Sequence, residues 1–238
     1  MLNSTLRIRG SGHWTHLSEH DLYPLLQSAN RRGHSTETAL LKIYNDILMA
    51  LNRREVVLLV LLDLSAAFDT VEHSVLISRL STSFGIRGTV LEWFVSYLSG
   101  RSQRVSLSGK CSESLQLNQG VPQGSFLGPL LFTLYVSKLF AVVKRHLPSV
   151  HAYADDTQLY LAFKPACASS TDDAIAATER CVNEIRAWML CDKLKINDGK
   201  TEFVIIGTHQ QLSKVHVDSL AVEDAQVPPV QLVKNLGT

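Results

Sequence analysis

The sequence has no long hydrophobic run and no secretory leader. Its longest charge-free apolar runs, such as Val56–Leu62, are far shorter than the roughly 20 residues that a membrane-spanning helix requires. Arg7 and Arg9 near the N-terminus are not followed by an apolar core segment or a small-residue cleavage site. We therefore expect an intracellular protein without a transmembrane span.

Cysteine is scarce and shows no metal-site or disulfide spacing. The 238 residues contain four cysteines, none in a Cys-x-x-Cys arrangement, which argues against a zinc ribbon and against a disulfide framework. His13, His16 and His20 could share one helical face, but no cysteine or acidic partners accompany them at metal-site spacing. We interpret these histidines as surface residues and the cysteines as reduced.

An excess of positive charge is also missing. Lys and Arg number 23 against 22 Asp and Glu, a net charge of +1, whereas nucleic-acid-binding chains usually carry a clear basic excess. Local basic pairs at Arg31–Arg32, Arg53–Arg54 and Lys144–Arg145 soften this objection, although each is also typical of a solvated surface. The net charge therefore argues against a nucleic-acid partner, whereas the local basic clusters are compatible with one.

The hydrophobic pattern predicts helices and strands in irregular alternation. Apolar residues at helical spacing follow Ser35, which with Thr36 is a candidate N-cap. The β-branched-rich run Val56–Leu62 predicts a strand buried on both faces. This alternation favours an α+β fold with a largely antiparallel sheet, backed by helices on one face. Further predicted elements are helices near 75–80, 90–98, 130–145 and 171–191, a hairpin over 103–117, and strands over 150–154, 158–163, 203–206 and 230–236.

Three aspartates stand at the ends of predicted strands. Asp155 and Asp156 are adjacent between two strand-like stretches, and Asp63 ends the most apolar run. Two carboxylates about 4 Å apart repel by roughly 4 kcal/mol at an effective dielectric of about 20, so a folded chain retains them where something offsets the repulsion. A bound divalent cation does so, and two such ions about 3.5–4 Å apart support phosphoryl transfer to a hydroxyl. The alternative for an isolated Asp-Asp pair is a polar turn.

Three motifs carry a resemblance to a known family. Residues 63–69 read DLSAAFD, residues 120–125 read GVPQGS, and residues 153–156 read YADD. In this order and at these separations they resemble the palm of a reverse transcriptase, and above all that of non-LTR (LINE-type) retrotransposons. The likeness runs from about Leu22 to Gly237. It implies a polymerase palm with partial fingers over 21–238, after a poorly patterned segment over 1–20, truncated at both ends and without full fingers, thumb or endonuclease.

The resemblance implies RNA-directed DNA synthesis by two-metal catalysis. Asp63, Asp155 and Asp156 match the family's catalytic and metal-binding triad. In that triad Asp63 and Asp155 bridge two Mg²⁺ or Mn²⁺ ions, and Asp156 supports the ion that activates the primer 3′-hydroxyl. Metal coordination lowers the pKa of the hydroxyl and neutralises charge on the leaving pyrophosphate. The implied partners are an RNA template, a DNA primer and deoxynucleoside triphosphates.

Other positions match family contacts with nucleotide and nucleic acid. Phe68 matches an aromatic residue that packs under the sugar of the incoming nucleotide and excludes a 2′-hydroxyl, with an ordinary core phenylalanine as the alternative. Lys200 matches a lysine near the nucleotide phosphates, with a solvated surface lysine as the alternative. Gln123 and Gly124 are the remaining nucleotide-contact positions. The positions matched to template or primer contacts are Arg31, Arg32, Gly120, Pro122, Leu236 and Gly237.

The glycine-rich loop has two interpretations. Glycines let a backbone approach a base pair or a phosphate closely, which suits the family's use of this loop. A tight turn shaped by Pro122 would also explain the string.

Departures from the family pattern leave other functions open. Asn30 stands where close relatives carry an aromatic residue, and Cys191–Asp192 replaces the usual polar pair. Because the thumb, the endonuclease and the upstream fingers motifs are missing from the pattern, the alternative is a catalytically inactive retrotransposon remnant that at most binds nucleic acid. A nucleotide cyclase on a similar palm is a third hypothesis, against which the GVPQGS loop argues.

Overall fold

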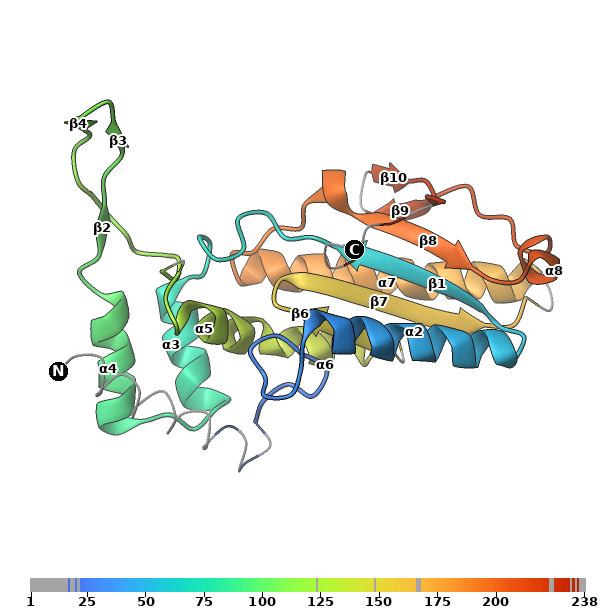
Figure 1. Ribbon diagram of the computed structural model, residues 1–238, viewed down its shortest axis with the longest axis horizontal. Coiled ribbons are helices and arrows are strands. Elements are labelled where there is room, and N and C mark those ends of the chain that lie inside the picture. Colours follow the sequence, from blue (N-terminus) through green and yellow to red (C-terminus); the bar gives the residue numbers. More distant parts are fainter. Residues whose placement is uncertain are drawn as a thin grey trace. The chain divides into compact units, whose positions relative to one another are not determined.

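The structure, a computed structural model, describes residues 17, 20, 22–122, 124–147, 149–165, 168–222, 225–231, 233 and 235 (Figure 1). The chain divides into two compact units. One consists of Pro24–Ser65 together with the residues from Ser137 onward, and the other of Ala66–Val136 together with the residues before Pro24.

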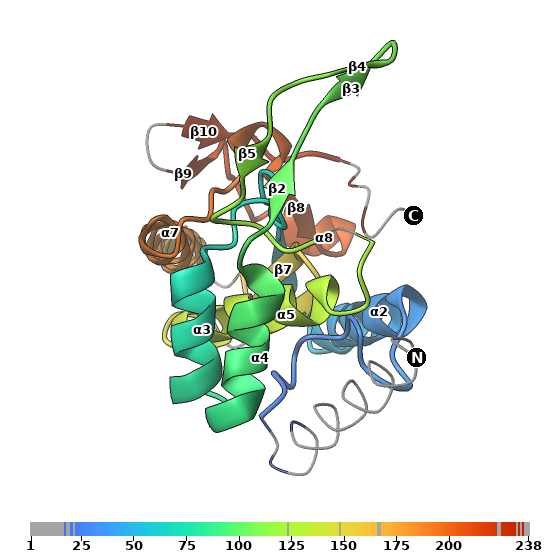
Figure 2. The ribbon, with the colours of Figure 1, turned by 90° about the vertical axis from the view of Figure 1, so that its left-hand side faces the viewer.

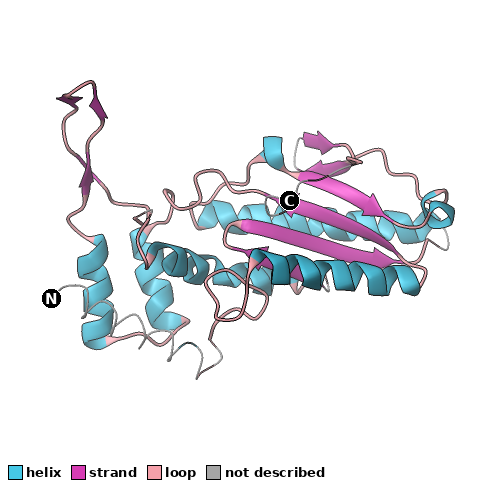
Figure 3. Cartoon of the chain, in the orientation of Figure 1, coloured by secondary structure: helices cyan, strands magenta, loops and turns pink. Residues whose placement is uncertain are grey.

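A four-stranded antiparallel sheet forms the centre of the first unit (Figure 3). Its order is β6-β7-β1-β8, so β1 (Val56–Leu62) lies between β7 (Asp156–Phe163) and β8 (Glu202–Ile206). The strand β6 (Ser149–Tyr153) pairs with β7 as a hairpin. The predicted α+β fold with a largely antiparallel sheet is confirmed, and β1 has the predicted bounds.

Helices cover both faces of this sheet, so the expectation of one covered face was wrong. Ile43 and Ala50 of α2 (Thr36–Asn52) pack against Val57 and Leu59. Alternate residues of β1 point to the opposite face, which faces α7 (Ala168–Cys191); Figures 1 and 2 show α2 and α7 on opposite sides of the sheet. Two covered faces explain why the whole of β1 is apolar.

The helix α2 begins where the sequence predicts. The Ser35 side chain accepts a hydrogen bond from the Thr38 backbone N–H at 3.2 Å, and the Ser35 N–H donates to Thr38 Oγ1 at 2.8 Å. This reciprocal pair, a capping box, gives hydrogen-bond acceptors to the backbone N–H groups of Ser35 and Thr38 at the start of the helix. Of the two candidate caps, the structure selects Ser35.

The predicted helix over 130–145 is interrupted. Pro129 lies in the first turn of α5 (Gly128–Tyr135), as expected of a residue that lacks a backbone N–H. A 3₁₀ turn over Val136–Lys138 follows, and then the short helix α6 (Leu139–Val143). The 3₁₀ turn coincides with the boundary between the two units, which apolar periodicity along the chain does not mark.

The described part of Ala66–Val136 forms three helices and an extended hairpin. The helix α3 (His73–Thr82) packs against α4 (Gly88–Leu98) and α5. The predicted hairpin over 103–117 is confirmed as two short ladders, in which β2 (Ser102–Gln103) pairs with β5 (Leu115–Gln116) and β3 (Ser106–Leu107) with β4 (Lys110–Cys111).

The described residues of the predicted strand over 230–236 form no strand. Pro229 makes a single parallel bridge with Phe203, and the Val230 N–H donates to the Phe203 carbonyl at 2.9 Å. Proline has no N–H for a ladder, and two prolines precede Val230. The hydrophobic pattern did not predict α8 (His209–Leu212), β9 (Leu220–Val222) or β10 (Ala225–Val227).

No helix in the part of the chain that the structure describes has the length and hydrophobicity to cross a membrane.

The buried side chains of β1 should contribute strongly to the stability of the unit that contains the sheet. Leu58 is 1% exposed on β1, so we expect Leu58→Ala to lower the free energy of unfolding by about 2–5 kcal/mol through lost contacts and a residual cavity. Leu41→Ala is the control, because Leu41 is 66% exposed on α2 and a surface change stays within about 0.5 kcal/mol. Urea unfolding followed by circular dichroism measures both, and equal losses would contradict the assigned core.

Candidate active site

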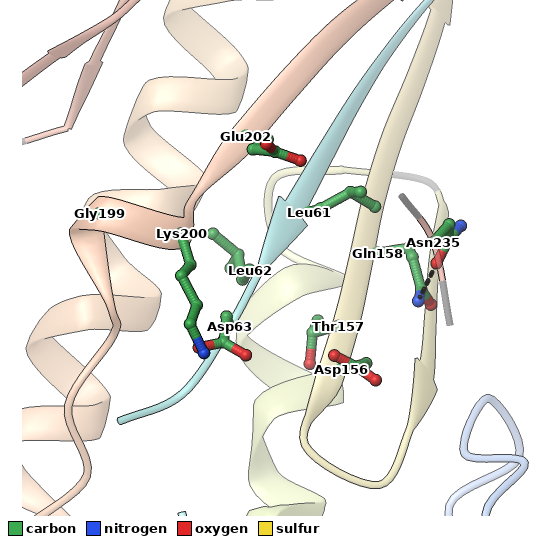
Figure 4. Close-up of a pocket in the computed structure, with 10 residues that line it drawn as sticks. All are labelled: Leu61, Leu62, Asp63, Asp156, Thr157, Gln158, Gly199, Lys200, Glu202 and Asn235. Carbon is green, nitrogen blue, oxygen red and sulfur yellow. Dashed lines mark hydrogen bonds and ion pairs between the residues drawn. The ribbon is translucent and has the colours of Figure 1, made fainter. Parts of the chain in front are cut away.

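The register of the central strands brings Asp63 to Asp156. The β1–β7 ladder ends with Leu62 opposite Thr157, so Asp63, the first residue after β1, follows at the position that faces Asp156. Residues directly opposite each other in an antiparallel pair have Cα atoms about 4.5–5.5 Å apart and side chains on the same face. Figure 4 shows both carboxylates directed into one cavity. Asp63 and Asp156, two members of the predicted triad, are thus brought together, whereas Asp155 is not among the described residues that line this cavity.

This cavity is polar and has a volume of about 290 Å³. All of its walls belong to the unit that contains the sheet. Its lining residues are Leu61, Leu62, Asp63, Asp156, Thr157, Gln158, Gly199, Lys200, Glu202 and Asn235.

Two polar side chains from the segment after α7 contact the Asp63 carboxylate. The Asn197 side-chain amide donates to Asp63 Oδ2 at 3.2 Å, and Lys200 Nζ lies 3.4 Å from the same oxygen. The backbone fixes this contact, because the Asn197 N–H donates to the Asp63 carbonyl at 2.9 Å. Asn197 was not singled out in the sequence, where an Asn before Asp-Gly is typical of a turn. Lys200 lies at the candidate site, and its nucleotide contact stays a prediction.

The three carboxylates interact electrostatically. Burial raises the pKa of Asp155 above its ordinary value, and repulsion by Asp63 adds to this, while a hydrogen bond from its own backbone and the charge of Lys200 oppose it. Burial also raises the pKa of Asp156, reinforced by the charges of Asp155 and then Asp63. The fold therefore disfavours the ionised forms of Asp155 and Asp156.

The donor set fits a hard divalent cation. Asp63 and Asp156 present carboxylate oxygens to one polar cavity, and Mg²⁺ is usually held by one or two carboxylates plus substrate phosphates. Within the described residues, no group of three or more His, Cys, Asp or Glu side chains is arranged as a complete metal site. The metal-binding role of Asp63, Asp155 and Asp156 stays a prediction.

Phe68 packs inside its own unit. Its ring centroid lies 4.7 Å from that of Phe132 on α5, with the planes tilted by 33°, and its carbonyl accepts a hydrogen bond from the Val121 N–H at 2.8 Å. The ring is half-buried. The role of Phe68 in excluding a 2′-hydroxyl stays a prediction.

The glycine-rich loop is shaped by close packing. Gly120 has φ +87°, and a Cβ there would lie 3.1 Å from the Asp69 carbonyl oxygen. A Cβ on Gly128 would lie 2.7 Å from the Pro122 carbonyl oxygen, so both positions exclude a side chain for intramolecular reasons. Gly120 and Pro122 also line a cavity of about 610 Å³ that Asp69, His73 and Arg101 share.

Arg31 and Arg32 do not line the cavity beside Asp63. Arg31 donates to the Leu25 carbonyl at 3.0 Å, and Arg32 is exposed. Gly124 is exposed, with φ +73°. The predicted positions Gln123, Leu236 and Gly237 lie outside the described residues.

One known family matches nearly the whole chain. Residues 13–237 match the family described as reverse transcriptase (RNA-dependent DNA polymerase), and the chain belongs to this family. It is a reverse transcriptase domain of the non-LTR (LINE-type) retrotransposon class, as its motifs predict.

Several curated relatives come from Drosophila melanogaster transposons. The chain is 30% identical over 190 residues to the "Probable RNA-directed DNA polymerase from transposon BS", covering 78% of this chain and 20% of that protein. It is 29% identical over 217 residues to the "Probable RNA-directed DNA polymerase from transposon X-element", covering 90% of this chain and 23% of that protein. The chain thus spans about a fifth of the length of these relatives.

Solved structures confirm the fold. Apo telomerase from Candida tropicalis, truncated from its C-terminal domain, superposes with a TM-score of 0.58 at 17% identity, over 85% of this chain and 40% of that chain. Telomerase from Candida albicans in complex with a TWJ fragment of telomeric RNA gives a TM-score of 0.58 at 14% identity, over 91% of this chain and 37% of that chain. The palm-like α+β fold is therefore shared at low sequence identity.

The clustered charges should destabilise the metal-free fold. Because the folded-state pKa of Asp156 is raised from 3.8, its destabilisation is absent below pH 3.8 and complete above the raised pKa. At pH 7 without metal, we expect Asp156→Asn to raise the free energy of unfolding by roughly 1 kcal/mol or less, since the group is partly exposed. Thermal melts across pH should show this gain vanish in acid.

Asp173→Asn is the matched control for that melt, because it removes the same charge from an exposed position on α7. Added Mg²⁺ should raise the melting temperature of the wild type more than that of Asp156→Asn. An equal or lower melting temperature for Asp156→Asn in metal-free buffer at pH 7 would contradict the electrostatic assignment.

Proposed function

We propose that this chain carries RNA-directed DNA polymerase activity, adding deoxynucleotides to a primer 3′-hydroxyl on an RNA template. The observation that supports this most is the placement of Asp63 and Asp156 on one face of adjacent strands, directed into one cavity, with Asp155 at the adjoining turn. Membership of the reverse transcriptase family supports the reaction type.

The carboxylates would act by holding divalent metal. Asp63, Asp155 and Asp156 would together hold Mg²⁺ or Mn²⁺. Bound metal lowers the pKa of the attacking hydroxyl and neutralises charge on the leaving pyrophosphate. Asn197 would keep the Asp63 carboxylate oriented through its 3.2 Å hydrogen bond. Catalysis of this kind rests on positioning and electrostatics.

Lys200 would change partners as substrate binds. In the metal-free chain its ammonium group lies 3.4 Å from Asp63 and its side chain is 69% exposed. An exposed lysine on a flexible stem can turn toward a triphosphate once metal neutralises Asp63. Phe68, Gln123 and Gly124 would contact the nucleotide, while Arg31, Arg32, Gly120, Pro122, Leu236 and Gly237 would contact template or primer.

A catalytically inactive remnant that binds nucleic acid is the second candidate. It stays a prediction. The nucleotide cyclase hypothesis loses its support because the chain belongs to the reverse transcriptase family.

Primer extension tests the proposal. The purified chain should extend a DNA primer on an RNA template only when Mg²⁺ or Mn²⁺ is present. Asp155→Asn should reduce the rate by more than the roughly 100-fold that loss of an outer-shell partner costs, whereas Asp173→Asn should retain wild-type rates. Metal-dependent extension excludes the inactive remnant, and extension that survives Asp155→Asn refutes the triad.

Sugar discrimination tests Phe68 separately. If the ring packs under the sugar, Phe68→Leu should raise the ratio of ribonucleotide to deoxynucleotide incorporation by roughly 10-fold or more, as expected for removal of a steric contact. Leucine retains apolar packing against Phe132. If Phe68 only fills the core of its unit, single-nucleotide kinetics should show both substrates slowed by the same factor.

A further inference from the structure

The turn that carries the two adjacent aspartates has an unfavourable backbone. Tyr153 pairs with Asp156 as the last pair of the β6–β7 hairpin, so Ala154 and Asp155 are its two turn residues. Ala154 has φ +57°, a left-handed conformation in which a Cβ is disfavoured and glycine or asparagine is preferred. Something else must stabilise Ala154 in this conformation.

A glutamine from a distant part of the chain contacts both backbone groups of Ala154. Gln27 Oε1 accepts the Ala154 N–H at 2.9 Å and the Ala29 N–H at 3.0 Å. Gln27 Nε2 donates to the Ala154 carbonyl at 3.1 Å. The orientation of the amide is unambiguous, because two backbone N–H groups can only donate and must face the oxygen. Gln27 itself is 0% exposed.

The backbone around Gln27 is fixed to the same hairpin. The Ser28 N–H donates to the Ala152 carbonyl at 2.9 Å, and the Ala152 N–H donates to the Leu26 carbonyl at 2.9 Å. A buried contact at 3.0 Å joins Ser28 Oγ to His151 Nε2. The segment 26–28 thus lies along the edge of β6, which leaves the Gln27 side chain within reach of the turn two residues further on.

We propose that Gln27 is a positioning residue for the catalytic carboxylates. By pairing with the N–H and C=O of Ala154, it holds the left-handed turn and so sets the direction in which Asp155 and Asp156 leave it. Released from this contact, Ala154 relaxes toward a right-handed or extended conformation, and the next two side chains turn away from Asp63. The effect on metal binding rests on the proposed function of the triad, whereas the effect on the turn does not.

Amide hydrogen exchange measures the turn without any need for activity. In Gln27→Leu the Ala154 amide loses its acceptor, and we expect its exchange to be at least 10-fold faster than in the wild type. Gln211→Leu is the matched control, because Gln211 is a buried glutamine whose Oε1 accepts the Thr208 N–H at 2.9 Å elsewhere in the same unit. Exchange at Ala154 that is no faster in Gln27→Leu than in Gln211→Leu overturns the proposal.

Binding of Mn²⁺ alone, followed by electron paramagnetic resonance, measures the consequence at the site. Loss of an outer-shell partner typically weakens metal binding by 10–100-fold, and we expect this for Gln27→Leu and less than a twofold change for Gln211→Leu. Adding Ala154→Gly to Gln27→Leu should restore part of the affinity, since glycine adopts the left-handed turn without a Cβ penalty. The contrary result is that Gln27→Leu weakens Mn²⁺ binding more than Gln211→Leu does, and that adding Ala154→Gly restores none of the lost affinity. Gln27 would then contribute only to general stability, and the positioning role is overturned.

If Gln27→Leu does not fold, Gln27→Glu provides the second variant. It retains an oxygen for the Ala154 N–H but has no donor for the Ala154 carbonyl, so Ala154 exchange should stay slow while Mn²⁺ binding weakens. Slow exchange with unchanged Mn²⁺ binding overturns the proposal. A wild type that binds no Mn²⁺ and extends no primer rejects the polymerase function, and the exchange rates still decide whether Gln27 holds the turn.

Discussion

The antiparallel pairing of β1 with β7 is the constraint on which the candidate site depends. Its register sets Leu62 opposite Thr157 and hence Asp63 opposite Asp156. A shift by one residue would send every side chain of β1 to the other face of the sheet. Because α2 and the opposite layer bury both faces, such a shift would break apolar packing throughout, and this packing holds the like charges together against their repulsion.

Polar side chains from two separate segments contact the aspartates and the turn that carries them. Asn197 and Lys200 reach Asp63 from the loop after α7, while Gln27 reaches the turn before Asp155 from the N-terminal side of α2. The contacts of Asn197 and Lys200 offset the negative charge of Asp63, and the contacts of Gln27 stabilise the backbone conformation of Ala154. Burial, reinforced by repulsion from the neighbouring carboxylates, nevertheless raises the pKa of Asp155 and of Asp156 above the ordinary value.

Local pattern predicted the elements that local chemistry controls. The strand Val56–Leu62, the Ser35 cap and the hairpin around the aspartates follow from apolar runs, capping side chains and turn residues, and the structure confirms each. The predictions were wrong where contacts with other parts of the fold determine the local structure. Periodicity marked 130–145 as one helix, yet a 3₁₀ turn at Val136–Lys138 interrupts it at the boundary between units. The apolar run after Pro229 forms no strand in its described residues, since proline cannot continue a ladder.

By itself, the sequence determined the family, through three motifs whose order is that of a reverse transcriptase palm, and it predicted a site at three aspartates. Only the tertiary structure decided which side chains support them. Gln27 and Ala154 are separated by 127 positions, and Asn197 and Asp63 by 134. Hydrogen bonds between such residues arise because sheet register and edge pairing place distant backbones side by side, and no local spacing in the sequence reports that proximity.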